Sequence, residues 1–279
     1  MIIRKKSLHL EAYGGLCNRL LAIDSALTLG AELEMPLIVY WYLDQGLGCR
    51  FEKLFITPIR VRLIQSDLRT FFGKCREKLI KRLIKWAGGY TPTISKLENI
   101  EAEKDRIRKA RITRIKSCTA FYGNGRFIQL FKPIPVLQAT IDTYKEKLGA
   151  KAIGIHIRRT DHEEAIKFSP LEEFERVILQ EIEANSQAVI YLATDDPQVE
   201  TTLVSKFSPN RIITQKDKPF DRSNSEGIQA ALIDFYCLAN CCRIYGSVGS
   251  TFGMVAAKVY NIPIKVVSRN DFPGGVDKI

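Results

Sequence analysis

Two adjacent arginines and a carboxylate follow a hydrophobic run in the second half of the chain. The run ends near His156, and Arg158, Arg159 and Asp161 come directly after it. A planar guanidinium can bind two phosphate oxygens at once, and a nearby carboxylate can hold it in position. These residue types at this spacing favour a diphosphate site. The alternative is that Arg158 and Arg159 are ordinary surface charges.

A pair of carboxylates, Asp195 and Asp196, ends the next hydrophobic run. They could lie beside the arginines, or they could form only a turn and a helix cap. A metal site is a further alternative, because carboxylate oxygens are ligands for hard cations. The neighbouring arginines can already neutralise phosphates, so we expect no metal and no cofactor other than a bound substrate.

A turn rich in glycine and hydroxyl groups precedes a late helical segment. It reads Gly246-Ser-Val-Gly249-Ser250-Thr251-Phe-Gly253. Free backbone N–H groups at the start of a helix, together with hydroxyls, form a seat for an anion. A tight loop without a ligand is the alternative. All three clusters follow predicted strands, where open parallel sheets bind ligands, so together they favour a nucleoside diphosphate.

Alternating strands and helices must position these clusters. We expect strands over 152–157, 188–193, 211–213, 243–245 and 264–267, and helices over 170–184, from 197, over 225–240 and over 251–260. Ser169 is expected to cap the first of these helices, with Pro170 at its first position and Glu172 in its first turn. Such alternation predicts a parallel, doubly wound sheet.

The first part of the chain shows a similar pattern. We expect a strand over 7–13, the break Gly14-Gly15, a helix over 17–31 and a strand over 37–41. Lys132-Pro-Ile-Pro135 is typical of a crossover between lobes. The prediction is an α/β protein with an N-terminal lobe over 1–140 and a C-terminal nucleotide-binding lobe over 141–279.

Four segments resemble the motifs of a known enzyme superfamily. His156–Asp161 with Ser169-Pro-Leu-Glu-Glu-Phe174 resembles the first motif of the α1,6-fucosyltransferases, the group of the N-glycan core and rhizobial nodulation enzymes. That group is related to the α1,2- and protein O-fucosyltransferases. Tyr191–Pro197 is similar to its second motif, and 228–234 with 250–251 to its third. Residues 14–19 resemble the glycine-rich loop with which many members open.

The resemblance covers 152–260 and, more thinly, 7–55, while 56–140 match nothing in it. It implies a two-lobed, GT-B-like fold in which each lobe is a Rossmann-type parallel sheet. It also implies an inverting, metal-independent transferase that moves fucose from GDP-fucose to a glycan or saccharide acceptor.

The resemblance further implies roles for individual residues. Arg158 would contact the β-phosphate and neutralise charge on departing GDP, with Arg159 in support. The implied donor-binding residues are Gly14, Gly15, Asn18, Arg19, His156, Asp161, Asp195, Asp196, Asp234, Ser250 and Thr251. Among these, His156 would contact the nucleotide, and Asp195 and Asp196 would orient the arginines. Asp234 would bind guanine, and Ser250 with Thr251 would bind the phosphates. Asn18 and Arg19 would face the donor.

The first motif departs from the family pattern after Asp161. The α1,6 enzymes continue through a Lys and then a Glu that acts as base, whereas here His162, Glu163 and Glu164 follow and the segment is one residue shorter. Glu163 or Glu164 could serve as the catalytic base, or an acid could position His162. The acceptor and the linkage therefore stay open.

The net charge of +11 is concentrated in one segment. Residues 69–116 hold fifteen basic and five acidic side chains, so we expect a basic helical insertion in the N-terminal lobe. Its helix, over 72–86, has Phe72, Cys75, Leu79, Leu83 and Trp86 at helical spacing. This apolar stripe could pack on its own lobe, or the helix could contact a membrane surface. Nucleic acid is not expected as a partner, because no recognition motif accompanies the charge.

The remaining composition is typical of a globular protein. Apolar residues make up 46% and charged ones 26%, which excludes disordered and collagen-like chains. Seven cysteines without a C-x-x-C pair, and three histidines without zinc spacing, favour free thiols in a reducing compartment. With no apolar run long enough to span a bilayer and no signal peptide pattern, we expect a cytoplasmic protein, with peripheral membrane contact through 72–86 left open.

Three other functions remain open. The same fold could use another nucleotide-sugar donor. The chain could instead bind GDP or a glycan without turnover. The basic helix could itself be the functional part, in a membrane or nucleic-acid adaptor.

Overall fold

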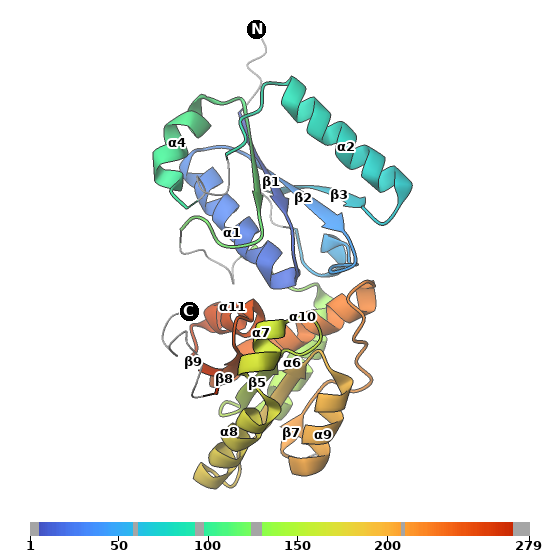
Figure 1. Cartoon of the computed structure of the whole chain (residues 1–279), viewed down its shortest axis with the longest axis vertical. Coiled ribbons are helices and arrows are strands. Elements are labelled where there is room, and N and C mark those ends of the chain that lie inside the picture. The colour runs from blue at the N-terminus through green and yellow to red at the C-terminus, as the bar shows by residue number, and fades with distance from the viewer. Residues whose placement is uncertain (1–5, 58–60, 93–97, 124–129, 208–209, 270–279) are drawn as a thin grey trace. The chain divides into compact units, whose positions relative to one another are not determined.

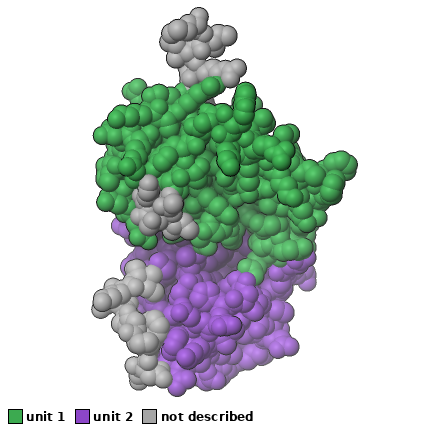
Figure 2. Space-filling model, turned by 45° about the horizontal axis from the view of Figure 1, so that its top comes forward, with its two compact units in different colours: residues 1–134, 222–228 green, residues 135–221, 229–279 purple. Residues whose placement is uncertain are grey.

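Two parallel β-sheets, built from the short apolar runs of the sequence, organise the chain in the computed structural model (Figure 1). The structure describes residues 6–57, 61–92, 98–123, 130–207 and 210–269. The chain divides into unit 1, residues 1–134 and 222–228, and unit 2, residues 135–221 and 229–279 (Figure 2). The division thus falls within the expected crossover at 132–135 rather than at residue 140, and a second segment, 222–228, returns to unit 1.

Unit 1 contains a four-stranded sheet in the order β3-β2-β1-β4, with each neighbouring pair parallel. Its elements are β1 (Ser7–Ala12), α1 (Leu16–Glu32), β2 (Leu37–Leu43), the 3₁₀ helix η1 (Phe51–Lys53), β3 (Val61–Asp67), α2 (Phe71–Trp86), α4 (Ile100–Lys109) and β4 (Ile112–Ser117).

Strand β2 shows why this sheet carries helices on both faces. Its residues alternate between the two faces, as in any strand, and nearly all of them are buried. Tyr40 and Tyr42 pack against Ile84 of α2. Trp41, on the opposite face, lies against the Arg19 guanidinium of α1, 5.3 Å from the ring centroid. The continuous apolar run is therefore the signature of a strand covered on two sides.

The basic segment 69–116 is an integral part of this α/β fold. Helices α2 and α4 lie between β3 and β4 in the chain, and β4, which pairs with β1, is itself built from the end of the segment. Residues 93–97 of the segment lie outside the described residues. The expected helix is confirmed, but the expectation of an insertion is corrected, because removing the segment would remove an edge strand.

Unit 2 contains a five-stranded sheet in the order β7-β6-β5-β8-β9, again with parallel neighbours. Its elements are α6 (Pro135–Leu148), β5 (Ile153–Ile157), α7 (Glu163–Phe168), α8 (Leu171–Ala184), β6 (Ile190–Thr194), α9 (Pro197–Phe207), β7 (Ile212–Ile213), α10 (Ser225–Ala239, its first turn in unit 1), β8 (Arg243–Ser247), α11 (Thr251–Tyr260) and β9 (Ile264–Val267). The doubly wound arrangement predicted for this part is confirmed.

Ser169 does not cap α8 as expected. The cap position belongs to Pro170, without a side-chain hydrogen bond, and the Ser169 side chain is fully buried. Its hydroxyl donates to the Val267 carbonyl at 2.6 Å and accepts from the Val248 N–H at 2.8 Å. The Ser169 hydroxyl is thus engaged by two backbone groups and does not cap the helix. It ties the start of α8 to β9 and to the loop after β8.

Phe174 offers a test of the unit 2 core. Its ring, fully buried on α8, packs in the cluster with Ile155 and Leu192. Phe174→Ala should lower the free energy of unfolding by about 3–5 kcal/mol, because it removes apolar contacts and leaves a cavity. Thermal and urea unfolding followed by circular dichroism would measure this loss. Val136→Ala, at an exposed position of α6, is the control; equal losses in the two variants would contradict the assignment of the core.

Candidate functional site

The strand order of unit 2 brings the predicted clusters to one sheet edge. The order reverses between β5 and β8, the position at which open α/β sheets form a ligand crevice beyond their carboxyl ends. His156 pairs in register with Ala193 of β6 and with Gly246 of β8. The residues that follow these three positions therefore emerge side by side.

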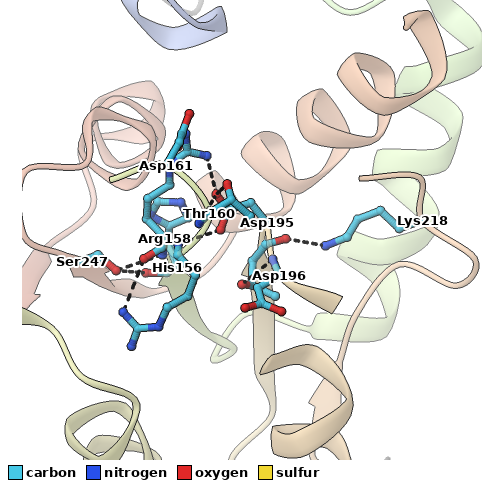
Figure 3. Close-up of polar contacts among 10 residues, drawn as sticks. His156, Arg158, Thr160, Asp161, Asp195, Asp196, Lys218 and Ser247 are labelled. Atoms are coloured by element: carbon cyan, nitrogen blue, oxygen red, sulfur yellow. Dashed lines mark hydrogen bonds and ion pairs between the residues drawn. The ribbon is translucent and has the colours of Figure 1, made fainter. Parts of the chain in front are cut away.

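Arg158 and Asp195 form the centre of this group (Figure 3). Arg158 Nη1 donates to Asp195 Oδ2 at 2.6 Å, and Arg158 Nη2 donates to Asp161. The Arg158 backbone N–H donates to the Ser247 hydroxyl at 3.0 Å, which joins β5 to β8. Of the five N–H donors of a guanidinium, these two contacts with described carboxylates use two. The group is thus oriented and still has donors for a ligand.

Asp195 is held by residues on the loop after β5. Its oxygens accept from the Thr160 hydroxyl at 2.6 Å and from the Arg159 N–H at 2.8 Å, in addition to Arg158. Burial raises the pKa of Asp195, but the Arg158 charge and these hydrogen bonds outweigh burial and keep the pKa below its ordinary value. A charged Asp195 therefore orients Arg158 near neutral pH.

Arg159 contacts backbone carbonyls. Nη2 donates to the Ser169 carbonyl at 2.6 Å and Nη1 to the Ala165 carbonyl at 3.3 Å. Burial lowers the pKa of Arg159, although its guanidinium stays charged. Arg159 thus fixes α7 and the entry to α8, which makes it a positioning residue.

His156 lies at the carboxyl end of β5 as a neutral imidazole. Its ring stacks on Phe252 of α11, with centroids 5.0 Å apart. Burial lowers its pKa to about 4, and the positive charges of Arg158 and Lys218 act in the same direction. Its buried Nδ1 has no hydrogen-bond partner among the described residues. An unpaired polar atom in such a position is a candidate for ligand contact.

The glycine-rich turn leads from β8 into α11. Gly249 has φ +67°, a left-handed conformation that favours glycine. Ser250 occupies the N-cap of α11 without a side-chain cap hydrogen bond, and Thr251 is the first helical residue. The first N–H groups of a helix have no intrahelical acceptor, and the helix dipole is positive at this end. The start of α11 therefore presents N–H donors and partial positive charge at the carboxyl end of β8.

His162 and Glu164 lie against that turn. A Cβ at Gly249 would be 2.8 Å from His162 Cε1 and 3.3 Å from Glu164 Oε2. His162 Nδ1 accepts from the Ala165 N–H at 3.1 Å and so caps the short helix α7. Glu163 is exposed in the first turn of α7. Of the two acids considered from the sequence, Glu164 is the one that the structure brings to the glycine-rich turn.

Asp196 forms the helix cap considered from the sequence, whereas Asp234 has partners that were not expected. Asp196 Oδ1 accepts from the N–H groups of Gln198 at 2.8 Å and Val199 at 3.4 Å, so this carboxylate caps α9 instead of orienting the arginines. Asp234 accepts from the Tyr191 hydroxyl, the Gln215 amide and the Lys218 ammonium at 2.6, 2.6 and 3.1 Å. These donors occupy three of the about four acceptor positions of the carboxylate, and the guanine-binding role stays a prediction.

Three site residues were not singled out from the sequence: Thr160, Lys218 and Ser247. Lys218 is buried, with only 3% of its side chain exposed, and donates to the Thr194 carbonyl at 3.0 Å. Thr160 and Ser247 stood inside the quoted motifs. The available signal was a hydroxyl between two charged residues for Thr160 and a hydroxyl in the glycine-rich turn for Ser247. Nothing in the sequence around Lys218 pointed to a site, because its partners come from β6, α9 and α10.

In unit 1 the Gly14-Gly15 loop is held by Arg19. Arg19 is fully buried, and its guanidinium donates to the Gly14 carbonyl at 2.8 Å, to Asp44 at 2.6 Å and to the Tyr42 carbonyl. The expectation that Arg19 faces the donor is therefore corrected: its donors are engaged within unit 1. Gly14 has φ +83°, and a Cβ there would lie only 3.0 Å from Asn18 Nδ2, so the turn requires glycine.

A pocket of about 560 Å³ lies at the carboxyl ends of β1 and β4 in unit 1. Here too the strand order reverses between the two strands. Its lining includes Tyr13, Lys116, Cys118, Phe121 and Tyr122, and Lys116 Nζ lies 5.0 Å from the Tyr13 ring centroid. Aromatic faces beside a cation and hydroxyls can bind a polar ring-shaped ligand.

In the described part of the chain, no three His, Cys, Asp or Glu residues lie together as a group that could hold a metal ion. The two carboxylates considered for a metal, Asp195 and Asp196, are instead engaged with the β5 loop and with α9.

Solved structures with a similar fold include fucosyltransferases. The chain matches NodZ α1,6-fucosyltransferase soaked with GDP-fucose at a TM-score of 0.63 and 18% identity, over 96% of each chain. It matches an Arabidopsis thaliana FUT1 mutant in complex with GDP at 0.63 and 14%, over 96% of this chain and 71% of that one. It matches POFUT1 in complex with GDP-fucose at 0.56 and 10%, over 94% and 98%.

No protein-family model matches the sequence, and no curated protein sequence matches it either. The similarity is therefore one of fold. The predicted α/β class with two parallel sheets is confirmed by the structure and agrees with this likeness of fold.

Gly249 provides a matched test of the glycine-rich turn. Gly249→Ala should destabilise the fold, because the new Cβ meets His162 and the backbone is left-handed. Gly149 has φ +66° and open space around it, so Gly149→Ala measures the cost of the left-handed backbone alone, about 1 kcal/mol. Thermal unfolding should show a larger loss for Gly249→Ala than for Gly149→Ala. Equal losses would mean that His162 and Glu164 do not pack on the turn.

Two buried histidines should make stability depend on pH. The pKa of His9 and that of His156 are lowered to about 4, mainly by burial. The unfolded chain takes up protons at these residues near pH 6.5 and the folded chain only near pH 4, so the free energy of unfolding should fall as the pH drops through this window. Melting temperatures between about pH 7.5 and 4 would measure the slope. His156→Gln should flatten it; a stability that rises on acidification would contradict the assignment.

Proposed function

We propose that this chain is a glycosyltransferase that transfers fucose from GDP-fucose to a glycan or saccharide acceptor. The observation that carries the proposal is the Arg158 guanidinium, oriented by Asp195 at the carboxyl end of β5. The start of α11 and its Ser250 hydroxyl follow β8, the strand next to β5. The fold similarity to structures described as containing GDP-fucose or GDP supports the choice of donor.

The chemistry of transfer explains why such a site suits a nucleotide sugar. The acceptor hydroxyl forms a bond to the anomeric carbon of fucose while the bond from that carbon to the β-phosphate oxygen breaks. The electron pair leaves with GDP, whose diphosphate gains negative charge. Preorganised donors aimed at this charge stabilise the transition state most effectively. Arg158 and the first N–H groups of α11 are such donors, and direct displacement inverts the anomeric centre.

The diphosphate would bind Arg158 in competition with Asp161. Asp161 is 54% exposed, whereas Asp195 is 16% exposed and held by further donors. A phosphate oxygen can therefore displace Asp161 from Nη2 while Asp195 keeps the guanidinium in place. With this cation and the helix terminus at the diphosphate, the transfer we propose needs no metal ion.

Glu164 is the proposed base for the acceptor hydroxyl, with His162 beside it. His162 and Glu164 lie against Gly249, next to the proposed phosphate seat. Glu163 and Glu164 are both exposed, but Glu163 supplies none of the nearest atoms to that glycine. A carboxylate can accept the proton as the new bond forms, and a neighbouring imidazole can position it. His156, with its unpaired Nδ1, is proposed to contact the nucleotide.

The acceptor is proposed to bind to unit 1 at the pocket beside Tyr13. Sugars present flat apolar faces that pack on aromatic rings, and Tyr13 and Tyr122 line this pocket together with Lys116. The nearby Gly14-Gly15 loop, with Asn18, is proposed to serve the donor. These assignments keep the predicted roles of an acceptor-side N-terminal lobe and a donor-side C-terminal lobe, with the division at residue 134 in place of 140.

Ligand-dependent thermal shift and turnover test the proposal. With EDTA present, GDP and GDP-fucose should raise the melting temperature, whereas UDP-glucose should not. A ligand present at about a hundred times its dissociation constant raises the free energy of unfolding by about 2.7 kcal/mol. Arg158→Ala should reduce the rate of GDP release from GDP-fucose by about 10²–10³-fold, because the variant no longer stabilises the negative charge of the leaving GDP. Arg176→Ala, an exposed arginine paired with Glu173 on α8, is the control.

The outcomes separate the alternatives left open by the sequence. A shift with another nucleotide sugar but not with GDP-fucose changes the donor. Binding of GDP without turnover across an acceptor panel indicates a non-catalytic binder. An Arg158→Ala protein with wild-type turnover would contradict the mechanism.

A further inference from the structure

Helix α2 turns a band of large apolar side chains to the outside of unit 1. Phe71, Phe72 and Trp86 are 76%, 83% and 84% exposed, and Leu79 and Leu83 are 56% and 54% exposed. Of the eleven large hydrophobic side chains that are exposed in the described residues, these are five. Figure 1 shows α2 along the outside of unit 1. The apolar stripe recognised in the sequence therefore does not pack on its own lobe.

A different row of α2 residues makes the contact with the sheet. Gly73 and Ile84 are buried, and Ile84 with Ile80 packs on Tyr40 and Tyr42 of β2. Gly73 allows the close approach, because a Cβ there would lie 1.8 Å from the Asp67 carbonyl oxygen. At 3.6 residues per turn, this row and the stripe lie on different faces of the helix. The rotation of α2 is thus set by its inward contacts, and the apolar face is left outward.

Basic side chains accompany the outward stripe. The sequence Phe71–Trp86 holds six lysines and arginines and one acid, Glu77, which is paired with Lys81. Lys74, Lys78 and Lys85 are exposed and, at helical spacing, form a row along one flank of the stripe. An outward face of this kind combines apolar anchors with a row of positive charge.

We propose that α2 binds peripherally to the surface of an anionic phospholipid bilayer. The stripe from Phe72 to Trp86 would enter the boundary between headgroups and acyl chains, and the lysine row would meet the lipid phosphates. Helices in the plane of a membrane have this pattern, and tryptophan favours the interfacial region. None of the helices within the described ranges is long and apolar enough to cross a bilayer. The proposal does not depend on the proposed transferase activity.

The charges and side-chain types of α2 favour a membrane over other occupants. A second copy would bring two helices of net charge +5 together across the same face, and like charges oppose this. Single-stranded nucleic acid is bound through aromatic rings that stack with bases. Here the centre of the stripe holds Leu79, which cannot stack.

Trp86 offers a direct reading of binding. The sequence has two tryptophans, and Trp41 is fully buried. A change in tryptophan fluorescence when the protein binds a surface therefore comes from Trp86. Vesicles of phosphatidylcholine with about 30% phosphatidylglycerol should shift the emission to shorter wavelength and carry the protein upward in flotation. Phosphatidylcholine vesicles alone should bind much more weakly, and about 0.5 M NaCl should weaken anionic binding by about tenfold or more. Trp86→Phe should lose the spectral shift.

Matched variants separate the stripe from general surface effects. Leu79→Gln with Leu83→Gln should reduce vesicle affinity by about tenfold or more without lowering the melting temperature, because both side chains are exposed. The control is Val136→Gln with Leu179→Gln, two exposed apolar residues of unit 2. Changing Lys74, Lys78 and Lys85 to Gln should abolish the preference for anionic vesicles. The same change at Lys145, Lys147 and Lys151 should not.

Three results would overturn the proposal. The first is no flotation and no spectral shift with anionic vesicles at about 0.05 M NaCl. The second is a dimer in light scattering that the Leu79 and Leu83 variant abolishes, with no vesicle binding. The third is tighter binding to DNA or RNA than to anionic vesicles through the same lysines. Because these measurements need no nucleotide, their failure leaves the test of transferase activity untouched.

Discussion

A half-buried carboxylate that must find donors organises the unit 2 site. Asp195 follows β6, and burial of its charge is unfavourable unless cations and N–H or O–H groups surround it. The loop after β5 supplies all of these, from the Arg158 guanidinium, the Arg159 N–H and the Thr160 hydroxyl. To reach Asp195 the loop must turn toward β6. That turn is what places Arg158 at the sheet edge with a fixed orientation.

Guanidinium groups hold the loops of both units. Arg159 bonds the carbonyls of Ala165 and Ser169 in unit 2, and Arg19 bonds those of Gly14 and Tyr42 in unit 1. Buried carbonyls need donors, and one planar guanidinium can donate to several of them at once. Adjacent arginines can therefore differ in role: Arg158 keeps donors for a ligand, whereas those of Arg159 shape the backbone around it.

Periodicity in the sequence was sufficient for most of the unit 2 fold. Helix 251–260 and strand 264–267 were predicted with the observed bounds, because a glycine turn and an asparagine bound the helix and a β-branched run forms the strand. Strands β3 and β4 were not predicted. Both lie next to strongly charged segments, where polar residues interrupt the apolar pattern. Periodicity also located α2, but a periodic pattern indicates only that an apolar face exists and not the side to which it turns.

The sequence by itself determined what depends on residue type and local spacing: the alternation of strands and helices, the carboxyl ends of strands as the site, and the pairing of Arg158 with a carboxylate. Only the tertiary structure decided which polar groups are engaged elsewhere. Asp234 accepts from three side chains, Arg19 is enclosed in unit 1, and Ser169 bonds backbone groups about eighty and one hundred residues away. The physical reason is that a side chain's function follows from the donors and acceptors that packing brings to it, and packing joins segments that local spacing cannot relate.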